Sequence, residues 1–134
     1  MITAVDTSVL IAIDQGEPDA EAWVELLVKA RAEGGLRIGE VVAAEFFAVV
    51  MDEGQMSATL EDLGIEFAPT SFRAASHAGE IFRRYRDQGG PREHLIPDFL
   101  IASQAMIDGD RLASADRGYL RKYFPGLTLL SPVG

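Results

Sequence analysis

Four acidic side chains, spread along the whole chain, stand where a shared site could use them. Asp6 follows the apolar run ITAV and Asp116 follows RLASA, while Asp98 comes directly after Pro97 and Glu45 interrupts the apolar stretch VVAAEFFAVVM. Carboxylates that crowd together raise one another's pKa, so a fold retains such a group when a cation balances it. Oxygen ligands without cysteine or histidine suit Mg²⁺ or Mn²⁺. If they converge, the four acids therefore predict a site for a hard divalent cation.

Each of these acids also has an ordinary structural explanation. Asp6 and Asp116 could cap the helices that follow them. A carboxylate in the first turn of a helix, as expected for Asp98, gains only about 0.3–1 kcal/mol from the helix dipole. Glu45 could share a solvent-facing strip with Asp52. For each aspartate taken alone, the structural role is the better explanation, whereas no broad polar stripe explains Glu45. Two acids at strand ends and two on helices that open nearby together favour one site.

Apolar runs and helix signals alternate along the chain and predict the elements that would position these acids. Strands are expected over residues 2–5, 36–38, 65–67, 111–115 and 127–130, and helices over 8–13, 18–33, 41–51, 57–63, 71–88, 97–107 and 117–124. This alternation predicts a three-layer α/β/α fold with a central, mostly parallel sheet, in which ligands gather at the carboxyl ends of the strands. The helix over 71–88 should bury residues at helical spacing, namely Phe72, Ala75, Ala78, Ile81, Phe82 and Tyr85.

The composition bounds the class of protein. The 134 residues have the size of a single domain, expected to span 1–134, and 48% of them are hydrophobic, which is enough for a sizeable core. The chain has no cysteine, which excludes disulfides, thiolate metal sites and a cysteine nucleophile. His77 and His94 lack the spacing of zinc ligands, so surface or helix-packing roles are expected for them. No signal peptide or membrane-spanning stretch is visible, and a cytoplasmic protein is expected.

The net charge of −9, from 12 basic and 21 acidic residues, disfavours loose electrostatic binding to a nucleic-acid backbone. The four candidate acids account for four of these charges, which leaves −5, and a cation bound among them would turn the site into an anion receptor. Arg92 and Arg117, nearest these acids in sequence, are the candidates for contacting phosphates. A solvated helix face explains Arg83, Arg84 and Arg86 at least as well as substrate binding does.

Four motifs in this order, VDTSVL, VVAAEFFAV, IPDFLIASQA and LASADRGY, resemble those of the PIN-domain ribonucleases. Within that family the chain looks most like the VapC toxins of bacterial and archaeal toxin–antitoxin pairs, and the resemblance spans nearly the whole chain. It implies a PIN-like α/β/α fold and an endoribonuclease that uses Mg²⁺ or Mn²⁺ to hydrolyse RNA phosphodiesters.

The family's acidic quartet falls on Asp6, Glu45, Asp98 and Asp116. The resemblance implies that the three aspartates hold the metal, directly or through water, and that Glu45 completes the charge and orients the attacking water. The family's hydroxyl positions fall on Ser8 and on Ser114, where threonine is more usual. Both hydroxyls would hydrogen-bond a carboxylate, a water or a phosphate.

Toxins of this kind form homodimers and bind a small cognate antitoxin. This VapB-like partner packs an apolar helix on the toxin and extends a basic tail to the acidic site. The resemblance therefore implies an RNA substrate, an antitoxin and a second copy of the chain as partners. Apolar residues near the amino terminus could form the antitoxin groove, with core packing as the alternative for most of them: Val9, Leu10, Ile11, Ile13, Trp23 and Leu27.

Other classes of function compete with a nuclease. A phosphatase of the haloacid-dehalogenase type needs a second aspartate two residues after the first, and position 8 is serine. A phospho-receiver domain needs an aspartate after its third strand, where this chain has Ala68-Pro69. A non-catalytic PIN-like scaffold or binding module fits the same sequence, and only an assay of RNA cleavage separates it from the enzyme.

Overall fold

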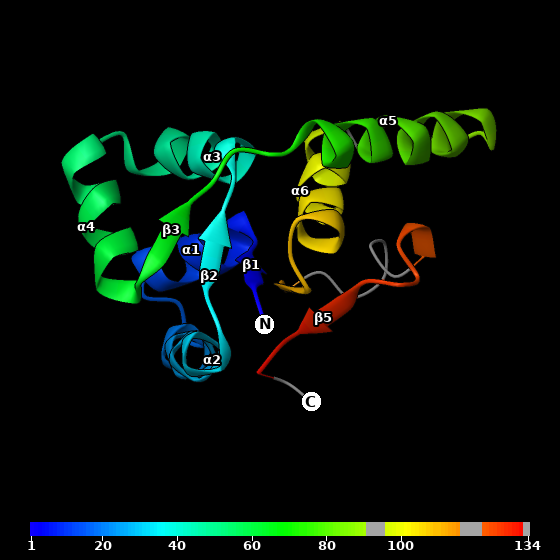
Figure 1. Ribbon diagram of the computed structural model, residues 1–134. Coiled ribbons are helices and arrows are strands. Elements are labelled where there is room, and N and C mark those ends of the chain that lie inside the picture. The colour runs from blue at the N-terminus through cyan, green and yellow to red at the C-terminus, as the bar shows by residue number, and fades with distance from the viewer. Residues whose placement is uncertain (91–95, 116–121, 133–134) are drawn as a thin grey trace.

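The computed structural model describes residues 1–90, 96–115 and 122–132 (Figure 1). Its strands are β1 (Thr3–Val5), β2 (Leu36–Ile38), β3 (Ile65–Phe67), β4 (Arg111–Ala113) and β5 (Thr128–Leu130). Its helices are α1 (Thr7–Asp14), α2 (Ala20–Glu33), α3 (Glu40–Val50), α4 (Glu53–Leu63), α5 (Phe72–Asp87) and α6 (Ile96–Ile107). Within these ranges no helix has both the length and the apolar character needed to span a bilayer.

The strands form one parallel sheet in the order β3-β2-β1-β4-β5. Right-handed crossovers place α1 to α4, which follow the steps from β1 to β3, on one face, and α5 and α6, which return across the sheet to β4, on the other. Figure 1 shows these two groups of helices on opposite sides of the strands. The predicted three-layer α/β/α fold with a parallel central sheet is confirmed.

The connection between α3 and α4 differs from the prediction. α4 begins at Glu53 rather than near residue 57, because Asp52 caps it and accepts a hydrogen bond from the backbone N–H of Gln55 at 3.0 Å. Asp52 therefore lies beyond α3 and does not continue a polar strip with Glu45. At the other end of the chain, β4 ends at Ala113, and most of the helix predicted over 117–124 lies outside the described residues.

The buried face of α5 is rotated from the predicted one. Phe72 is 91% exposed and Ala75 is also exposed, while Ala74, Ala78 and Tyr85 are buried. The predicted burial of Phe72 and Ala75 is thus wrong, because α5 packs antiparallel against α6 through the other side of its first turns. Three contacts between the two helices fix this arrangement: Ser71 N to Asp108 Oδ2 at 2.9 Å, His77 Nδ1 to Ser103 Oγ at 2.9 Å, and the rings of Tyr85 and Phe99 at 5.3 Å.

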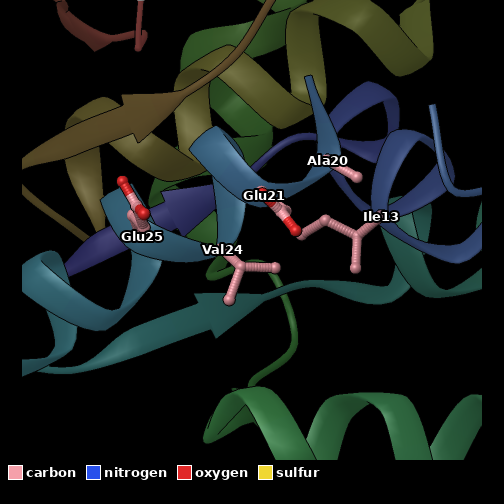
Figure 2. Close-up of a pocket in the computed structure, with 5 residues that line it drawn as sticks. All are labelled: Ile13, Ala20, Glu21, Val24 and Glu25. Carbon is pink, nitrogen blue, oxygen red and sulfur yellow. The ribbon is translucent and has the colours of Figure 1, made fainter. Parts of the chain in front are cut away.

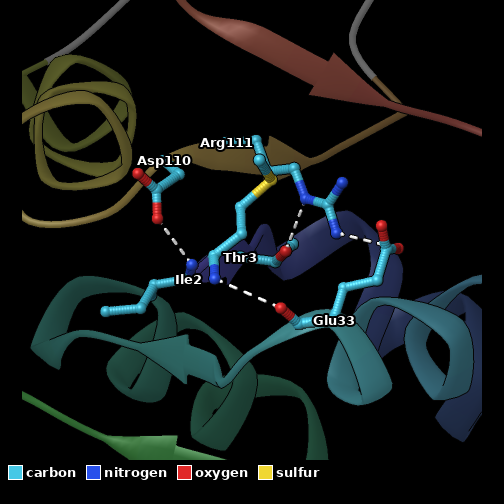
Figure 3. Close-up of polar contacts among 6 residues, drawn as sticks. Ile2, Thr3, Glu33, Asp110 and Arg111 are labelled. Atoms are coloured by element: carbon cyan, nitrogen blue, oxygen red, sulfur yellow. Dashed lines mark hydrogen bonds and ion pairs between the residues drawn. The ribbon is translucent and has the colours of Figure 1, made fainter.

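A buried arginine joins the amino ends of β1 and β4 (Figure 3). Arg111 Nε donates to Thr3 Oγ1 at 2.8 Å, and its Nη2 lies 3.2 Å from Glu33 Oε1 at the end of α2. Beside it, Asp110 accepts a hydrogen bond from Ile2 N at 2.6 Å. These contacts fix the register of the central strands at the edge where they begin.

Gln104, in the middle of α6, fixes the opposite edge of the sheet. Its Nε2 donates to the backbone carbonyl of Ala68, directly after β3, at 2.8 Å. Gly39, directly after β2, faces the same amide so closely that a Cβ atom there would lie 2.7 Å from Nε2. A Cβ atom at position 39 would therefore displace the Gln104 amide from its hydrogen bond to Ala68.

We therefore expect Gly39→Ala to destabilise the protein by about 1–3 kcal/mol through overpacking. Gly79→Ala is the matched control, because a Cβ atom at Gly79 in α5 meets nothing within 4 Å. This control should stabilise the helix by up to about 1 kcal/mol. Urea unfolding measures the change in the free energy of unfolding for each variant. Changes of the same sign in both variants would contradict the close packing of Gln104 on Gly39.

Candidate active site at the carboxyl edge of the sheet

Asp6 lies at the carboxyl end of the central strand, β1. Its backbone N–H donates to the carbonyl of Ala113 at 3.0 Å, which ties it to the end of β4. It is the N-cap of α1, and its Oδ1 accepts a hydrogen bond from Thr7 N at 2.8 Å. The structural explanation of Asp6 as a helix cap is thus correct, but it uses only one of the two carboxylate oxygens.

The second oxygen of Asp6 faces Ser114, across the strand boundary. Ser114 directly follows β4, is 1% exposed, and donates from Oγ to Asp6 Oδ2 at 2.7 Å. The same oxygen lies 3.4 Å from the hydroxyl of Ser8, which is a long and weak hydrogen bond. The structure therefore brings three of the predicted site residues together and gives the shortest contact to Ser114.

Thr7 connects this group to the second acid, and the sequence analysis gave it no role. Its backbone N–H binds Asp6, while its hydroxyl donates to Glu45 Oε1 at 2.6 Å. Glu45 comes from the middle of α3, which packs against α1, and is half-buried. The signal in the sequence was a second hydroxyl in VDTS, but only the packing of α1 on α3 shows that it reaches Glu45.

Burial raises the pKa of the Asp6 carboxyl above its ordinary value of 3.8, and the negative charge of Glu45 raises it further. The hydrogen bonds from Ser114, Thr7 and Ser8 act in the opposite direction and lower this pKa without cancelling the effect of burial. Desolvation disfavours the charged form of a carboxyl group. The site therefore holds a negative charge at a cost that a cation would offset.

Asp98 lies in the first turn of α6 and is half-buried. Gln104, six residues later, already contacts the chain just past β3, and α6 then runs toward Asp110 at the amino edge of β1. Six residues span about 9 Å along a helix axis. The first turn of α6 therefore extends beyond the carboxyl edge of the sheet, the edge where Asp6 lies. Three further candidates, Asp116, Arg92 and Arg117, lie outside the described residues.

The donors at this edge suit a hard divalent cation. Asp6 and Glu45 supply carboxylate oxygens, and Thr7, Ser8 and Ser114 supply hydroxyls, all of which are oxygen ligands. In the part of the chain that the structure describes, no three acidic or histidine side chains lie close enough to hold an ion. The described residues thus provide a linked pair of acids, Asp6 and Glu45, rather than a complete set of ligands.

Other candidate residues have structural roles. His77 packs between helices, with its ring bonded to Ser103 and 6.0 Å from the ring of Phe124, which confirms the helix-packing role. Arg83 and Arg84 form ion pairs with acids one turn away on α5, Asp87 at 3.2 Å and Glu80 at 2.5 Å. The solvated helix face is therefore the better explanation of these two arginines.

The sequence model of the PIN domain matches residues 3–125. The chain belongs to the PIN domain family. No curated protein sequence matches it. The resemblance drawn from the four motifs is thus confirmed at the level of the family, and the region of Asp6 is the candidate active site of a PIN domain.

Three solved structures are similar to this PIN domain over nearly its whole length. A chain of VapBC2 from Rickettsia felis, bound to a DNA fragment from its promoter, has a TM-score of 0.74 and 21% identity, with 97% of this chain and 98% of that chain covered. VapBC-1 from nontypeable Haemophilus influenzae has a TM-score of 0.71 and 16% identity, with both chains covered completely. DNA-bound VapBC from Salmonella typhimurium has a TM-score of 0.65 and 19% identity, with 97% of both chains covered. At these identities the likeness establishes a shared fold.

The raised pKa of Asp6 predicts a pH-dependent stability. The folded state binds the proton more tightly than the unfolded state, so the cost of the charge is complete above the folded pKa and disappears as the pH falls below 3.8. In a chelator, Asp6→Asn should therefore raise the free energy of unfolding at neutral pH, and the gain should shrink with acidification. Asparagine is as good an N-cap as aspartate, so the cap is preserved.

The matched control for this measurement is Asp52→Asn, which changes the exposed N-cap of α4 in the same way. The difference between the two variants therefore separates the effect of the site around Asp6 from the effect of replacing a capping carboxylate. Urea unfolding between pH 4 and pH 8 in EDTA compares the two variants. An Asp6→Asn variant that is less stable than wild type at neutral pH would contradict the assigned cost of burial.

Proposed function

We propose that this PIN domain is a VapC-type toxin, a metal-dependent endoribonuclease that cleaves RNA phosphodiesters and is inhibited by a cognate antitoxin. The observation that carries the proposal is the half-buried Asp6 carboxylate, bonded to Ser114 and linked through Thr7 to Glu45, at the carboxyl edge of a parallel sheet. Membership of the PIN family supports the nuclease activity. The likeness to chains of three VapBC complexes supports the assignment as a toxin.

The proposed metal ligands are Asp6, Asp98 and Asp116, with Mg²⁺ or Mn²⁺ as the ion. When bound, such an ion acidifies water and neutralises phosphate oxygens. The protein's own part is to orient the donors. The Ser114 hydroxyl donates to Oδ2 of Asp6 and the Thr7 backbone N–H donates to Oδ1, and together they fix the orientation of this carboxylate. The Thr7 hydroxyl binds Oε1 of Glu45, which leaves Oε2 to accept a hydrogen bond from the attacking water and to take its proton.

The test is RNA cleavage by variants that keep the shape of the site. Asp6→Asn and Glu45→Gln should each lower the cleavage rate by about 100-fold or more, because each removes a charge that acts on the reacting groups. Asp62→Asn, which neutralises an exposed acid on α4, is the charge-matched control and should cleave like wild type. The rate is measured with a fluorophore–quencher RNA in Mg²⁺ or Mn²⁺, with EDTA as the blank.

Thr7 gives a finer test of the same site. Thr7→Val should lower the rate by about 10–100-fold, as loss of an outer hydrogen bond to a metal-site carboxylate does, and Thr7→Ser should restore most of it. Mn²⁺ should raise the melting temperature of wild type but not of Asp6→Asn. If the folded Asp6→Asn and Glu45→Gln variants cleave RNA as fast as Asp62→Asn, the assignment of the nuclease site to Asp6 and Glu45 is wrong. RNA binding without any cleavage by wild type would identify a scaffold instead.

A pocket on the helical face between α1 and α2 supports an antitoxin as partner (Figure 2). Ile13, Ala20 and Val24 give it an apolar floor, while Glu21 and Glu25 stand at its rim. Of the residues predicted to form a groove, Val9, Leu10, Trp23 and Leu27 lie in the core, and Ile13 reaches this pocket. An apolar floor with an acidic rim is complementary to an amphipathic helix that carries lysine or arginine.

We expect Val24→Glu to weaken the complex with the antitoxin while RNA cleavage stays unchanged. Val49→Glu is the control, since Val49 is 44% exposed on α3 and does not line the pocket. The readout is growth of cells that express each variant together with the cognate antitoxin. Rescue of growth that is equal for Val24→Glu and Val49→Glu would place the antitoxin elsewhere on the toxin.

A further inference from the structure

A second pocket, of about 260 Å³, lies between α2 and the strands β4 and β5. It is separate from the candidate active site, since Arg111 opens β4 at the amino edge of the sheet whereas Ser114 follows its carboxyl end. Its lining combines three apolar residues with three charged ones: Leu26, Ala30, Leu130, Lys29, Glu33 and Arg111. Neither the nuclease chemistry nor the antitoxin pocket uses any of these side chains.

Arg111 brings a buried guanidinium with spare donors to this pocket. Its side chain is only 10% exposed, and a guanidinium has five N–H donors. Nε donates to Thr3 and Nη2 to Glu33, so three N–H groups have no protein acceptor in the part of the chain that the structure describes. In Figure 3 one terminal nitrogen of Arg111 carries no dashed line. Buried polar groups normally find a partner, and the pocket is where an acceptor can reach these donors.

Lys29 adds a second cation at the same opening. Its side chain is exposed and lines the pocket, and it forms no ion pair with any residue in the described ranges. Two cations, Lys29 and Arg111, thus face one carboxylate, Glu33, which leaves the pocket with one net positive charge. In a chain with a net charge of −9, this is a local reversal of sign.

We propose that this pocket binds a small organic anion, a carboxylate or a phosphate ester. Its oxygens would accept hydrogen bonds from the terminal nitrogens of Arg111 and from Nζ of Lys29, and its carbon portion would lie on Leu26 and Leu130. Charge-assisted hydrogen bonds of this kind are roughly twice as strong as neutral ones. The site is independent of the proposed nuclease activity, and no step of RNA cleavage requires it.

The experiment is an amide ¹H–¹⁵N titration of the full chain with sodium acetate and, separately, with sodium phosphate, each against sodium chloride at equal ionic strength. Acetate and phosphate are both anions whose oxygens accept hydrogen bonds. The probe that binds with the higher affinity shows whether the ligand is a carboxylate or a phosphate ester. We expect saturable shifts confined to α2, Arg111 and Leu130. Lys29→Gln should weaken binding about tenfold, the effect of losing one hydrogen bond to a charged group.

Arg31→Gln is the matched control, because Arg31 is an exposed cation two residues further along α2 that does not line the pocket. This variant should bind the probes like wild type, and so should Asp6→Asn, which separates this site from the nuclease. Shifts that sodium chloride reproduces would overturn the proposal, as would equal affinities in Lys29→Gln and Arg31→Gln. Shifts centred on residues 6–8 would also overturn it, because they would place the anion at the acidic site.

Discussion

The site depends on one costly placement, a half-buried carboxylate at the end of the central strand. Burial raises the pKa of Asp6, and only hydrogen bonds from Ser114, Thr7 and Ser8 partly offset that cost. Two of these donors, Thr7 and Ser8, belong to α1 and the third, Ser114, follows β4, so the carboxylate is held from two elements. A charge that is expensive and already oriented is suited to a divalent cation, since the ion recovers the free energy that the fold spends on desolvation.

The order of the strands makes this arrangement possible. β1 lies between β2 and β4, so the first acid of the chain meets a serine that follows it by 108 residues. The steps from β1 to β2 and β3 carry α1 and α3 to the same face, where Thr7 reaches Glu45. The return to β4 carries α6 across the carboxyl edge, where Gln104 contacts Ala68. Asp6, Glu45 and Ser114 thus come from the segments that follow three different strands of one sheet.

The two ends of the strands carry sites of opposite charge. At the carboxyl edge, Asp6 and Glu45 add negative charge where a metal and a phosphate would bind. At the amino edge, the buried Arg111 fixes the register of β1 and β4 through Thr3. It also lines a pocket whose net charge is positive, opposite in sign to the acidic site. On α5, Arg83 and Arg84 are paired with acids of their own helix.

The sequence by itself determined the alternation of strands and helices, the parallel sheet and the residues of the acidic motifs, because hydrophobic periodicity and short motifs are local properties. It also identified Asp6 through its position just after a strand, and Ser114 through the resemblance of LASADRGY to a PIN-domain motif. The tertiary structure alone decided that Thr7 links Asp6 to Glu45, that Phe72 faces solvent and that the Gln104 amide packs against Gly39. These three facts depend on how one helix is rotated and seated against its neighbours. That rotation is set by packing between segments far apart in the chain, and no local pattern encodes it.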